Sequence, residues 1–114
     1  MLTIYHNPRC SKSRQTLSLL QDQGLEPEIV LYLETAPSPE TITLLLKKLG
    51  IGARQLLRRG EQDYKDQRLA DASLSEQQLI AAMATYPKLI ERPVVVNGER
   101  AAIGRPPEAV LEII

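Results

Sequence analysis

In the first third of the chain, the pattern of apolar and polar residues predicts a strand, then a helix and then a second strand. Short β-prone runs at 2–5 and 28–32 flank a segment of helical character that begins at Ser11 and continues to Gln23. Gly24 follows this segment, and glycine is the residue that most often terminates a helix. A strand, a helix and a second strand in close succession form a βαβ unit, so these residues predict two parallel strands.

The middle of the chain has the period of helices. After Ser38, which suits an N-cap, apolar residues recur at the spacing of one helix face until Gly50. That face consists of Ile42, Leu45, Leu46 and Leu49. Further helical segments are predicted at 53–59, within the polar stretch 61–73, and from the capping box at 75–78.

The last third returns to the pattern of strands. Apolar runs at 94–96 and 101–103 flank Asn97-Gly98, a dipeptide that favours tight β-hairpins. A helix is predicted from about Pro106 to the C-terminus, because proline suits the first turn of a helix. This stretch therefore predicts a ββα unit.

The complete order of elements is β-α-β, a helical insert, and β-β-α. This order is typical of the thioredoxin-like architecture, so we expect an α/β fold with a four-stranded mixed sheet. The helical insertion, at about residues 38–88, separates the βαβ and ββα halves of a single domain over 1–114. Arg92-Pro93 directly precedes the third strand, where such folds usually carry a cis peptide bond.

Composition narrows the class of protein. The chain has 114 residues, of which 43% are hydrophobic and 25% are charged, as expected for one globular domain. It contains neither Trp nor Phe, so its core must be aliphatic. Lys and Arg number 14 and Asp and Glu number 14, and this balance argues against a general binder of nucleic acids or membrane surfaces. A single Cys excludes an internal disulfide and argues against a four-thiolate metal site.

The sequence carries no visible signal for export or membrane insertion. Its first residues lack a basic segment followed by an apolar core. No apolar run approaches the roughly 18 residues of a membrane-spanning helix. We therefore expect a cytoplasmic protein with no membrane partner, in a compartment where thiols stay reduced.

Cys10 is the first candidate for chemistry, because it lies between a predicted strand and a predicted helix. At a helix N-terminus a thiol meets the positive end of the helix dipole and free backbone N–H groups, which also bind tetrahedral oxyanions. Three basic neighbours, Arg9, Lys12 and Arg14, add positive charge. Many single cysteines are only small buried apolar residues, but this position favours the reactive thiolate.

Two further polar residues can assist this thiol. His6, the only histidine, comes shortly before Cys10 in the same loop. Ser13 takes the place of the second cysteine of a Cys-x-x-Cys motif, so its hydroxyl can donate to a Cys10 thiolate. Each also has an ordinary structural interpretation, His6 as a strand-end residue and Ser13 as a residue that satisfies the first turn of a helix.

Arginines near the ends of the predicted elements can bind an oxyanion. Arg92 precedes Pro93, and in a thioredoxin-like fold this position faces the cysteine loop. Arg105 follows the predicted hairpin, while Arg58 and Arg59 end a short helical segment. Any one arginine taken alone is more often a solvated surface residue, but planar guanidinium groups suit bidentate binding of tetrahedral oxyanions.

These residues fall within blocks that resemble the glutaredoxin-coupled arsenate reductase family, here termed ArsC-like. The blocks are Tyr5-His6-Asn7-Pro8-x-Cys10-x-x-Ser13-Arg14, Leu31-Tyr32-Leu33-Glu34, Leu56-Leu57-Arg58, Leu89-Ile90-x-Arg92-Pro93-Val94-Val95 and Arg105-Pro106. They span nearly the whole chain, so the resemblance implies a single ArsC-like domain. It gives roles to the nucleophile Cys10, its helpers His6 and Ser13, and the oxyanion-binding Arg58, Arg92 and Arg105. The Leu-Leu-Arg block favours Arg58 over Arg59.

The resemblance implies reduction of arsenate to arsenite through a thiol-arsenate adduct on Cys10. Glutathione is then the co-substrate and glutaredoxin the protein partner, with no metal, no bound cofactor and no nucleic acid. Two alternatives remain on the same scaffold. One is a related thiol oxidoreductase or deglutathionylase with another substrate. The other is a redox regulator that binds RNA polymerase, although Ser13 removes the Cys-x-x-Cys switch of such regulators.

Overall fold

The computed structural model describes residues 2–114. Its strands are β1 (Leu2–Tyr5), β2 (Glu28–Val30), β3 (Val94–Asn97) and β4 (Arg100–Ile103). Its helices are α1 (Ser11–Asp22), α2 (Pro39–Leu49), α3 (Ala53–Leu56), α4 (Gln62–Asp66), α5 (Glu76–Thr85) and the 3₁₀ helices η1 (Pro87–Leu89) and η2 (Pro107–Ile113). The chain forms two compact units, one from the residues up to Thr35 with Arg92–Ile114 and the other from Ala36–Glu91. The second unit contains the insert predicted at about 38–88, and the assignment of 1–114 to a single domain stays a prediction.

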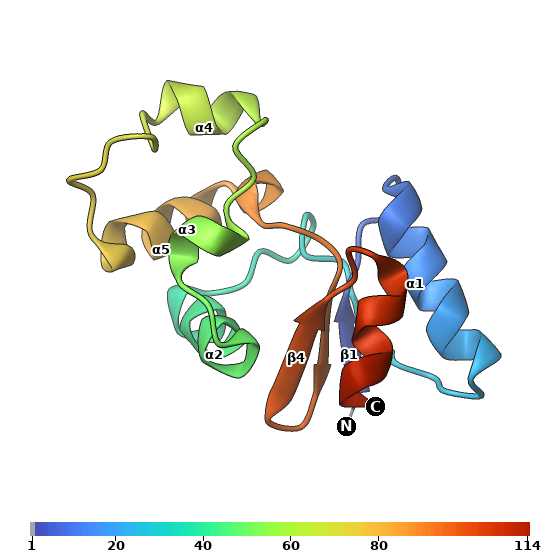
Figure 1. Cartoon of the computed structure of the whole chain (residues 1–114). Coiled ribbons are helices and arrows are strands. Elements are labelled where there is room, and N and C mark those ends of the chain that lie inside the picture. The colour runs from blue at the N-terminus through green and yellow to red at the C-terminus, as the bar shows by residue number, and fades with distance from the viewer. Residues whose placement is uncertain (1) are drawn as a thin grey trace. The chain divides into compact units, whose positions relative to one another are not determined.

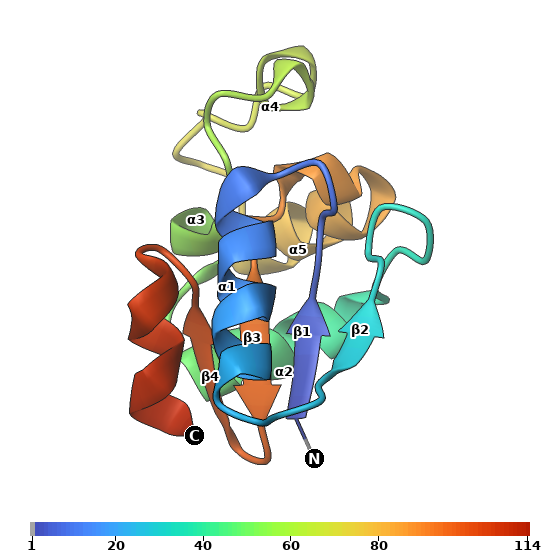
Figure 2. The same ribbon diagram turned by 90° about the vertical axis from the view of Figure 1, so that its right-hand side faces the viewer.

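The first unit is built on a four-stranded mixed sheet (Figure 1), and its strands follow the order β2-β1-β3-β4 (Figure 2). β1 and β2 are parallel, with Ile4 opposite Ile29. β3 is antiparallel to both of its neighbours, and Val95 lies opposite Ile4 on β1 and Ala102 on β4. These pairings confirm the predicted α/β fold, with a βαβ half and a ββα half that share one sheet.

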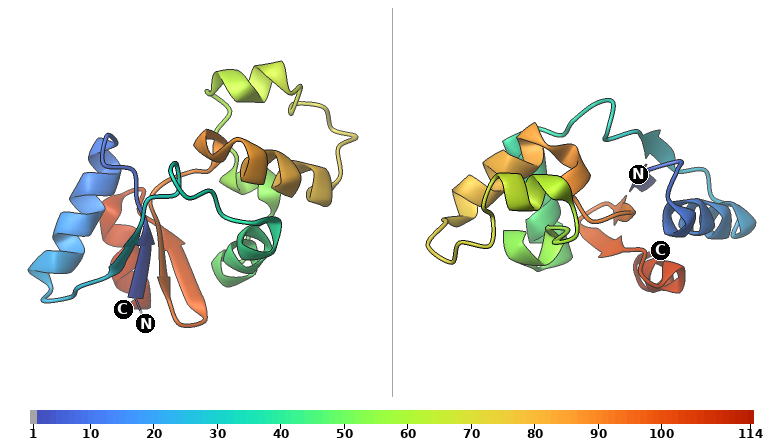
Figure 3. Two further views of the ribbon diagram at one scale, coloured as in Figure 1. Left: turned by 180° about the vertical axis from the view of Figure 1, so that it is seen from behind. Right: turned by 90° about the horizontal axis from the view of Figure 1, so that it is seen from above.

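α1 and η2 cover one face of this sheet, and they lie side by side in the view from above (Figures 2 and 3). The aliphatic side chains buried there are Ile4, Leu20, Val95, Val110 and Ile113. Burial of one such side chain stabilises a fold by about 1.5–3 kcal/mol. This core therefore anchors α1, the helix that begins directly after Cys10.

Two helices of the second unit, α2 and α5, are capped where the sequence predicts. Ser38 Oγ accepts a hydrogen bond from Thr41 N (3.2 Å), and α2 ends at Gly50, whose φ of 70° lies in the left-handed region that glycine tolerates best. At the start of α5, Gln78 N donates to Ser75 Oγ (3.1 Å) and Ser75 N donates to Gln78 Oε1 (2.7 Å). The predicted capping box is confirmed.

β2 is shorter than predicted. It ends at Val30 rather than at residue 32. The carbonyl of Leu31 accepts hydrogen bonds from Glu34 N and Thr35 N, each at 2.9 Å, and these bonds turn the chain away from the sheet. The β-prone run was thus overridden by a local turn.

Two helical predictions also differ from the structure. α3 stops at Leu56 instead of residue 59, because Leu57 forms an isolated antiparallel β-bridge with Ile90. The C-terminal helix begins at Pro107 and is a 3₁₀ helix. This helix packs against α1 and β4. Hydrophobic periodicity does not distinguish a short 3₁₀ helix from an α-helix.

Peptide bonds before two prolines are cis. Arg92-Pro93 is cis, as expected for this fold class, and Arg105-Pro106 is cis as well, which the sequence did not indicate. Gly104 N donates to Pro93 O (2.9 Å), so the segments that carry these bonds lie next to each other.

A methyl group at Gly104 is expected to destabilise the fold. A Cβ atom there would lie 2.5 Å from Thr16 Oγ1 and 2.8 Å from Pro93 Cγ, and both neighbours are buried. Overpacking of this kind costs about 1–3 kcal/mol, so Gly104→Ala should lower the free energy of unfolding by that amount in urea titrations. Gly60→Ala is the control, because a Cβ there meets nothing within 4 Å. Equal stability of the two variants would contradict the close contact.

Candidate active site

Cys10 lies where the loop after β1 meets α1. Its backbone is extended (φ −94°, ψ 123°), and its carbonyl accepts the first helical hydrogen bond from Arg14 N (3.0 Å). The residue is buried, and its side chain makes no capping hydrogen bond. The thiol therefore stands at the end of α1 where the helix dipole favours negative charge.

Hydrogen bonds hold the loop before Cys10 in a tight turn. Asn7 Oδ1 accepts from Arg9 N (3.0 Å), and Asn7 O accepts from Cys10 N (3.0 Å). Arg14 Nη1 donates to Pro8 O (2.8 Å). Asn7 was not among the predicted site residues, although asparagine side chains commonly bond the backbone two residues on, and this was the available signal.

His6 and Ser13 are joined to each other. His6 Nδ1 lies 2.6 Å from Ser13 Oγ, and both residues are buried. Ser13 Oγ also accepts a hydrogen bond from Asn7 N (3.0 Å). A hydroxyl has one proton, so while Ser13 donates to His6 it does not donate to a Cys10 thiolate. Assistance of Cys10 by His6 and Ser13 stays a prediction.

The His6 imidazole is expected to titrate below its ordinary range. Burial lowers the pKa of His6 from 6.5, and the positive charge of Arg14 lowers it further. Between that lowered pKa and 6.5 the unfolded chain binds a proton that the folded chain does not, so the stability that His6 supports is lost as the pH falls below about 6.5. Because His6 is the only histidine, its imidazole resonance in an NMR titration needs no assignment. A midpoint at or above 6.5 would contradict the buried placement.

The sheet brings Arg92 and Arg105 together at the Cys10 end. Val94 at the start of β3 pairs with Ile103 at the end of β4, so the residues just beyond this pair are neighbours. Arg105 Nε donates to Arg92 O (2.8 Å), and Arg105 Nη2 lies 3.6 Å from Cys10 Sγ. The Nε and Nη1 atoms of Arg92 are buried. The first unit thus joins Cys10, Arg105 and the backbone of Arg92.

Arg58 belongs to the second unit, so its assignment to the oxyanion site rests on the family resemblance. Its Nη1 donates to Glu61 Oε2, its Nε lies 3.6 Å from Glu91 Oε1, and its backbone N donates to Leu89 O (2.8 Å). The side chain is 25% exposed. Arg59 is exposed. Of the two neighbouring arginines, Arg58 is therefore the one with a fixed orientation.

Residues 2–114 contain no group of three or more His, Cys, Asp and Glu side chains that could hold a metal ion. No helix in this range is long and apolar enough to cross a membrane. The groups gathered around Cys10 in the first unit are its thiol, the N-terminus of α1 and the guanidinium of Arg105. Together they suit nucleophilic attack on a small tetrahedral anion.

The sequence profile of the ArsC family matches residues 5–113 of the chain. The chain belongs to the ArsC family. Among relatives of this ArsC protein, the Escherichia coli (strain K12) protein named "Uncharacterized protein YfgD" is 61% identical over 112 residues, which cover 97% of this chain and 94% of that protein. A Haemophilus influenzae protein named "Arsenate reductase" is 49% identical over 112 residues, which cover 97% of each chain.

Solved structures also resemble this ArsC protein. The structure titled "Arsenate reductase from Vibrio cholerae" superposes with a TM-score of 0.97 at 53% sequence identity, over 99% of this chain and 97% of that chain. This agreement confirms the thioredoxin-like fold expected from the order of elements and the ArsC-like fold implied by the resemblance.

Proposed function

We propose that this ArsC protein is an arsenate reductase that uses glutathione and glutaredoxin. The observation that carries the proposal is the 3.6 Å contact between Arg105 Nη2 and Cys10 Sγ at the start of α1. A guanidinium beside the nucleophilic sulfur is placed to bind an incoming oxyanion next to that sulfur. Relatives from Haemophilus influenzae and Vibrio cholerae carry the name arsenate reductase, which supports arsenate as that oxyanion.

In the first step the sulfur of Cys10 attacks arsenic. Arsenate, as H₂AsO₄⁻, is held by the N-terminus of α1 and by Arg92 and Arg105. An As–S bond forms, an As–O bond breaks, and the departing hydroxyl leaves as water with the proton of the thiol. Arsenic stays pentavalent in this adduct. As the sulfur adds to arsenic, the guanidinium groups stabilise the negative charge on the arsenate oxygens.

In the second step the thiol of glutathione attacks the Cys10 sulfur of the adduct. An S–S bond forms, the As–S bond breaks, and its electron pair stays on arsenic, which becomes trivalent. The proton of the glutathione thiol passes to an oxygen of arsenite. Each sulfur is oxidised by one electron. A glutaredoxin thiol then takes the glutathione from Cys10, because a chain with one cysteine cannot resolve the mixed disulfide internally.

A coupled assay tests this function. The protein is mixed with arsenate, glutathione, glutaredoxin, glutathione reductase and NADPH, and NADPH oxidation is followed. We expect steady turnover that stops when arsenate, glutathione or glutaredoxin is omitted, and one glutathione on Cys10 in the quenched enzyme by mass spectrometry. Full activity with thioredoxin alone would contradict the glutathione scheme. Turnover on a glutathionylated substrate without arsenate would favour a deglutathionylase instead.

Arg58→Ala is expected to lower kcat/KM for arsenate more than Arg59→Ala. Arg58 is held by Glu61 and Glu91, whereas Arg59 is exposed. A guanidinium with a fixed orientation loses less freedom when it binds an oxyanion. Both variants are compared in the coupled assay after their unfolding midpoints have been matched to the wild type. A larger effect of Arg59→Ala would assign the oxyanion role to the neighbouring residue.

A further inference from the structure

We propose that a cavity next to the Cys10 loop binds the γ-glutamyl end of glutathione, with Arg9 on its α-carboxylate and Glu34 on its α-ammonium. Glutathione is the co-substrate of the proposed function, so this inference rests on that function. It goes further, because it names the place and the side chains that hold the co-substrate while its thiol attacks the adduct.

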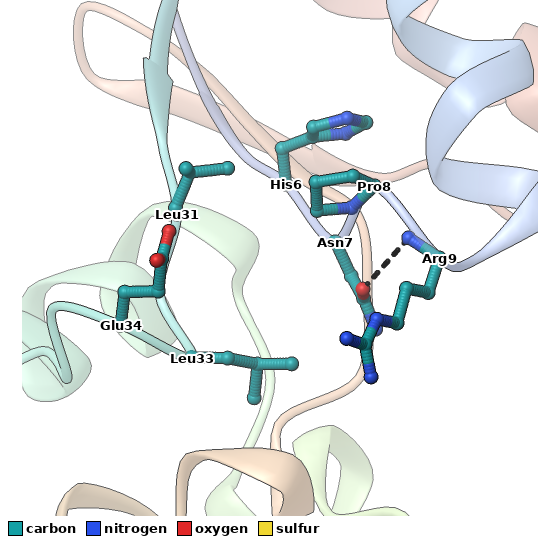
Figure 4. Close-up of a pocket in the computed structure, with 7 residues that line it drawn as sticks. All are labelled: His6, Asn7, Pro8, Arg9, Leu31, Leu33 and Glu34. Carbon is teal, nitrogen blue, oxygen red and sulfur yellow. Dashed lines mark hydrogen bonds between the residues drawn. The ribbon is translucent and has the colours of Figure 1, made fainter.

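The cavity has a volume of about 350 Å³ and lies between the loop after β1 and the turn after β2 (Figure 4). Residues 6–9 form one wall, and Leu31, Leu33 and Glu34 form the other. Both walls belong to the first unit. Its volume falls at the lower end of the range of roughly 300–1,000 Å³ that is usual for small-molecule sites. It therefore suits one end of a tripeptide.

The cavity has a cation on one wall and an anion on the other. Figure 4 shows Arg9 and Glu34 on opposite sides, with Leu31 and Leu33 beside Glu34. Arg9 and Glu34 are exposed, and neither takes part in an ion pair within residues 2–114. A ligand that satisfies both charges carries a carboxylate and an ammonium group next to methylene groups. The γ-glutamyl end of glutathione has this composition.

Both walls are held in place before any ligand binds. Arg9 N donates to Asn7 Oδ1, and His6 N donates to Val30 O (2.9 Å), which ties the loop to β2. On the other wall, Glu34 N donates to the carbonyl of Leu31. A site whose backbone is already ordered loses little entropy on binding, which favours affinity for a small flexible peptide.

One wall of the cavity is adjacent along the chain to the reacting residue. Arg9 precedes Cys10 directly, so their Cα atoms are about 3.8 Å apart. An extended peptide spans about 3.3–3.6 Å per residue, and the γ-linkage of glutathione adds methylene groups, so the first two residues of glutathione cover at least roughly 7 Å. A ligand anchored at Arg9 can thus present its sulfur to the adduct on Cys10.

A second cavity, of about 440 Å³, lies along α1 and the start of η2 and serves as the comparison. Among its lining residues are one cation, Lys12, and two anions, Asp22 and Glu108. Glutathione has two carboxylates and one ammonium at neutral pH, so a net negative cavity repels it. The balanced cavity at Arg9 and Glu34 is the better match.

The test measures binding without turnover. Full-length Cys10→Ser is titrated with reduced glutathione, and amide NMR shifts and calorimetry give the site and the dissociation constant. We expect amide shifts at residues 6, 7, 9 and 31–34. Arg9→Gln and Glu34→Gln, each added to Cys10→Ser, should both weaken binding, by roughly tenfold for Arg9. Glu108→Gln, in the second cavity, is the matched control and should leave the affinity unchanged.

The direction in which Glu34→Gln changes the affinity for glutathione decides between the proposal and its alternative. If glutathione were held only as an anion, removal of the Glu34 charge would tighten binding, and this result would overturn the proposal. Shifts confined to residues around Glu108 would overturn it as well. γ-Glutamylcysteine should bind nearly as well as glutathione, whereas cysteinylglycine should bind weakly, and the reverse order would also refute the assignment. This binding experiment contains no arsenate, so its result does not depend on arsenate turnover. A failure of the proposed function would appear in the coupled assay, and a failure of the glutathione site would appear here.

Discussion

Cys10→Ser is expected to abolish arsenate reduction and to leave the fold intact. Serine has nearly the same shape, but its hydroxyl neither ionises near neutral pH nor forms the S–S bond through which two electrons reach arsenic. Removal of a catalytic nucleophile lowers kcat by several orders of magnitude in well-studied enzymes, so we expect a loss of at least roughly 10³-fold. Stability should not fall, because Cys10 occupies the N-cap of α1, where serine is a preferred residue.

Arsenite formation measures the loss of activity, and urea unfolding measures the stability of the variant. Ser18→Ala is the matched control, because it makes a change of similar size at an exposed position on the same helix. It should retain full activity. Residual turnover of Cys10→Ser above roughly 1% of wild type would show that the reaction does not pass through a covalent bond to Cys10.

Arg105→Ala is expected to reduce kcat/KM for arsenate by roughly 10²-fold, within the range of about 2–4 kcal/mol for loss of one donor to a developing oxyanion. The variant removes the guanidinium 3.6 Å from Cys10 Sγ and its hydrogen bond to Arg92 O. The sulfur of Cys10 and the bound oxyanion therefore both lose the guanidinium as a partner. Arg105→Lys should recover only part of the rate, because an ammonium group supplies charge without the planar pair of donors.

Arg100→Ala is the matched control for Arg105. Arg100 pairs with Asn97, which pairs with Leu2 at the start of β1, whereas Cys10 follows the end of β1. Its Nη2 donates to Glu112 O at the surface, so its loss should change kcat/KM less than twofold. Equal behaviour of the two variants would remove Arg105 from the site.

Features set by neighbouring residues were predictable from the sequence. The N-cap of α2 at Ser38, the capping box of α5 and the left-handed Gly50 each depend on residues within one helical turn. The β3–β4 hairpin follows from two apolar runs around a turn dipeptide. The prediction erred at the end of β2, where a local turn ends the strand, at the end of α3, where Leu57 forms a β-bridge with Ile90, and in the 3₁₀ class of η2.

Within the candidate site, the sequence predicted a set of residues but not their hydrogen-bond partners. Ser13 was expected to donate to Cys10, and its observed partners are His6 and Asn7. A hydroxyl at this position has several acceptors and donors within reach, and the choice among them depends on how the loop after β1 closes onto α1. Arg9 and Glu34 illustrate the same limit, because only the turn after β2 sets them on two walls of one cavity.

The sequence by itself determined the order of elements, the aliphatic core and the place of Cys10 at a helix N-terminus, because each is encoded in the periodicity or caps of a short segment. Only the tertiary structure decided that Arg105 contacts Cys10, 95 residues away along the chain. That contact arises because β3 lies between β1 and β4, so the ends of three strands and the start of α1 meet at one edge of the sheet. Strand order results from packing over the whole unit, and no local pattern of residues specifies it.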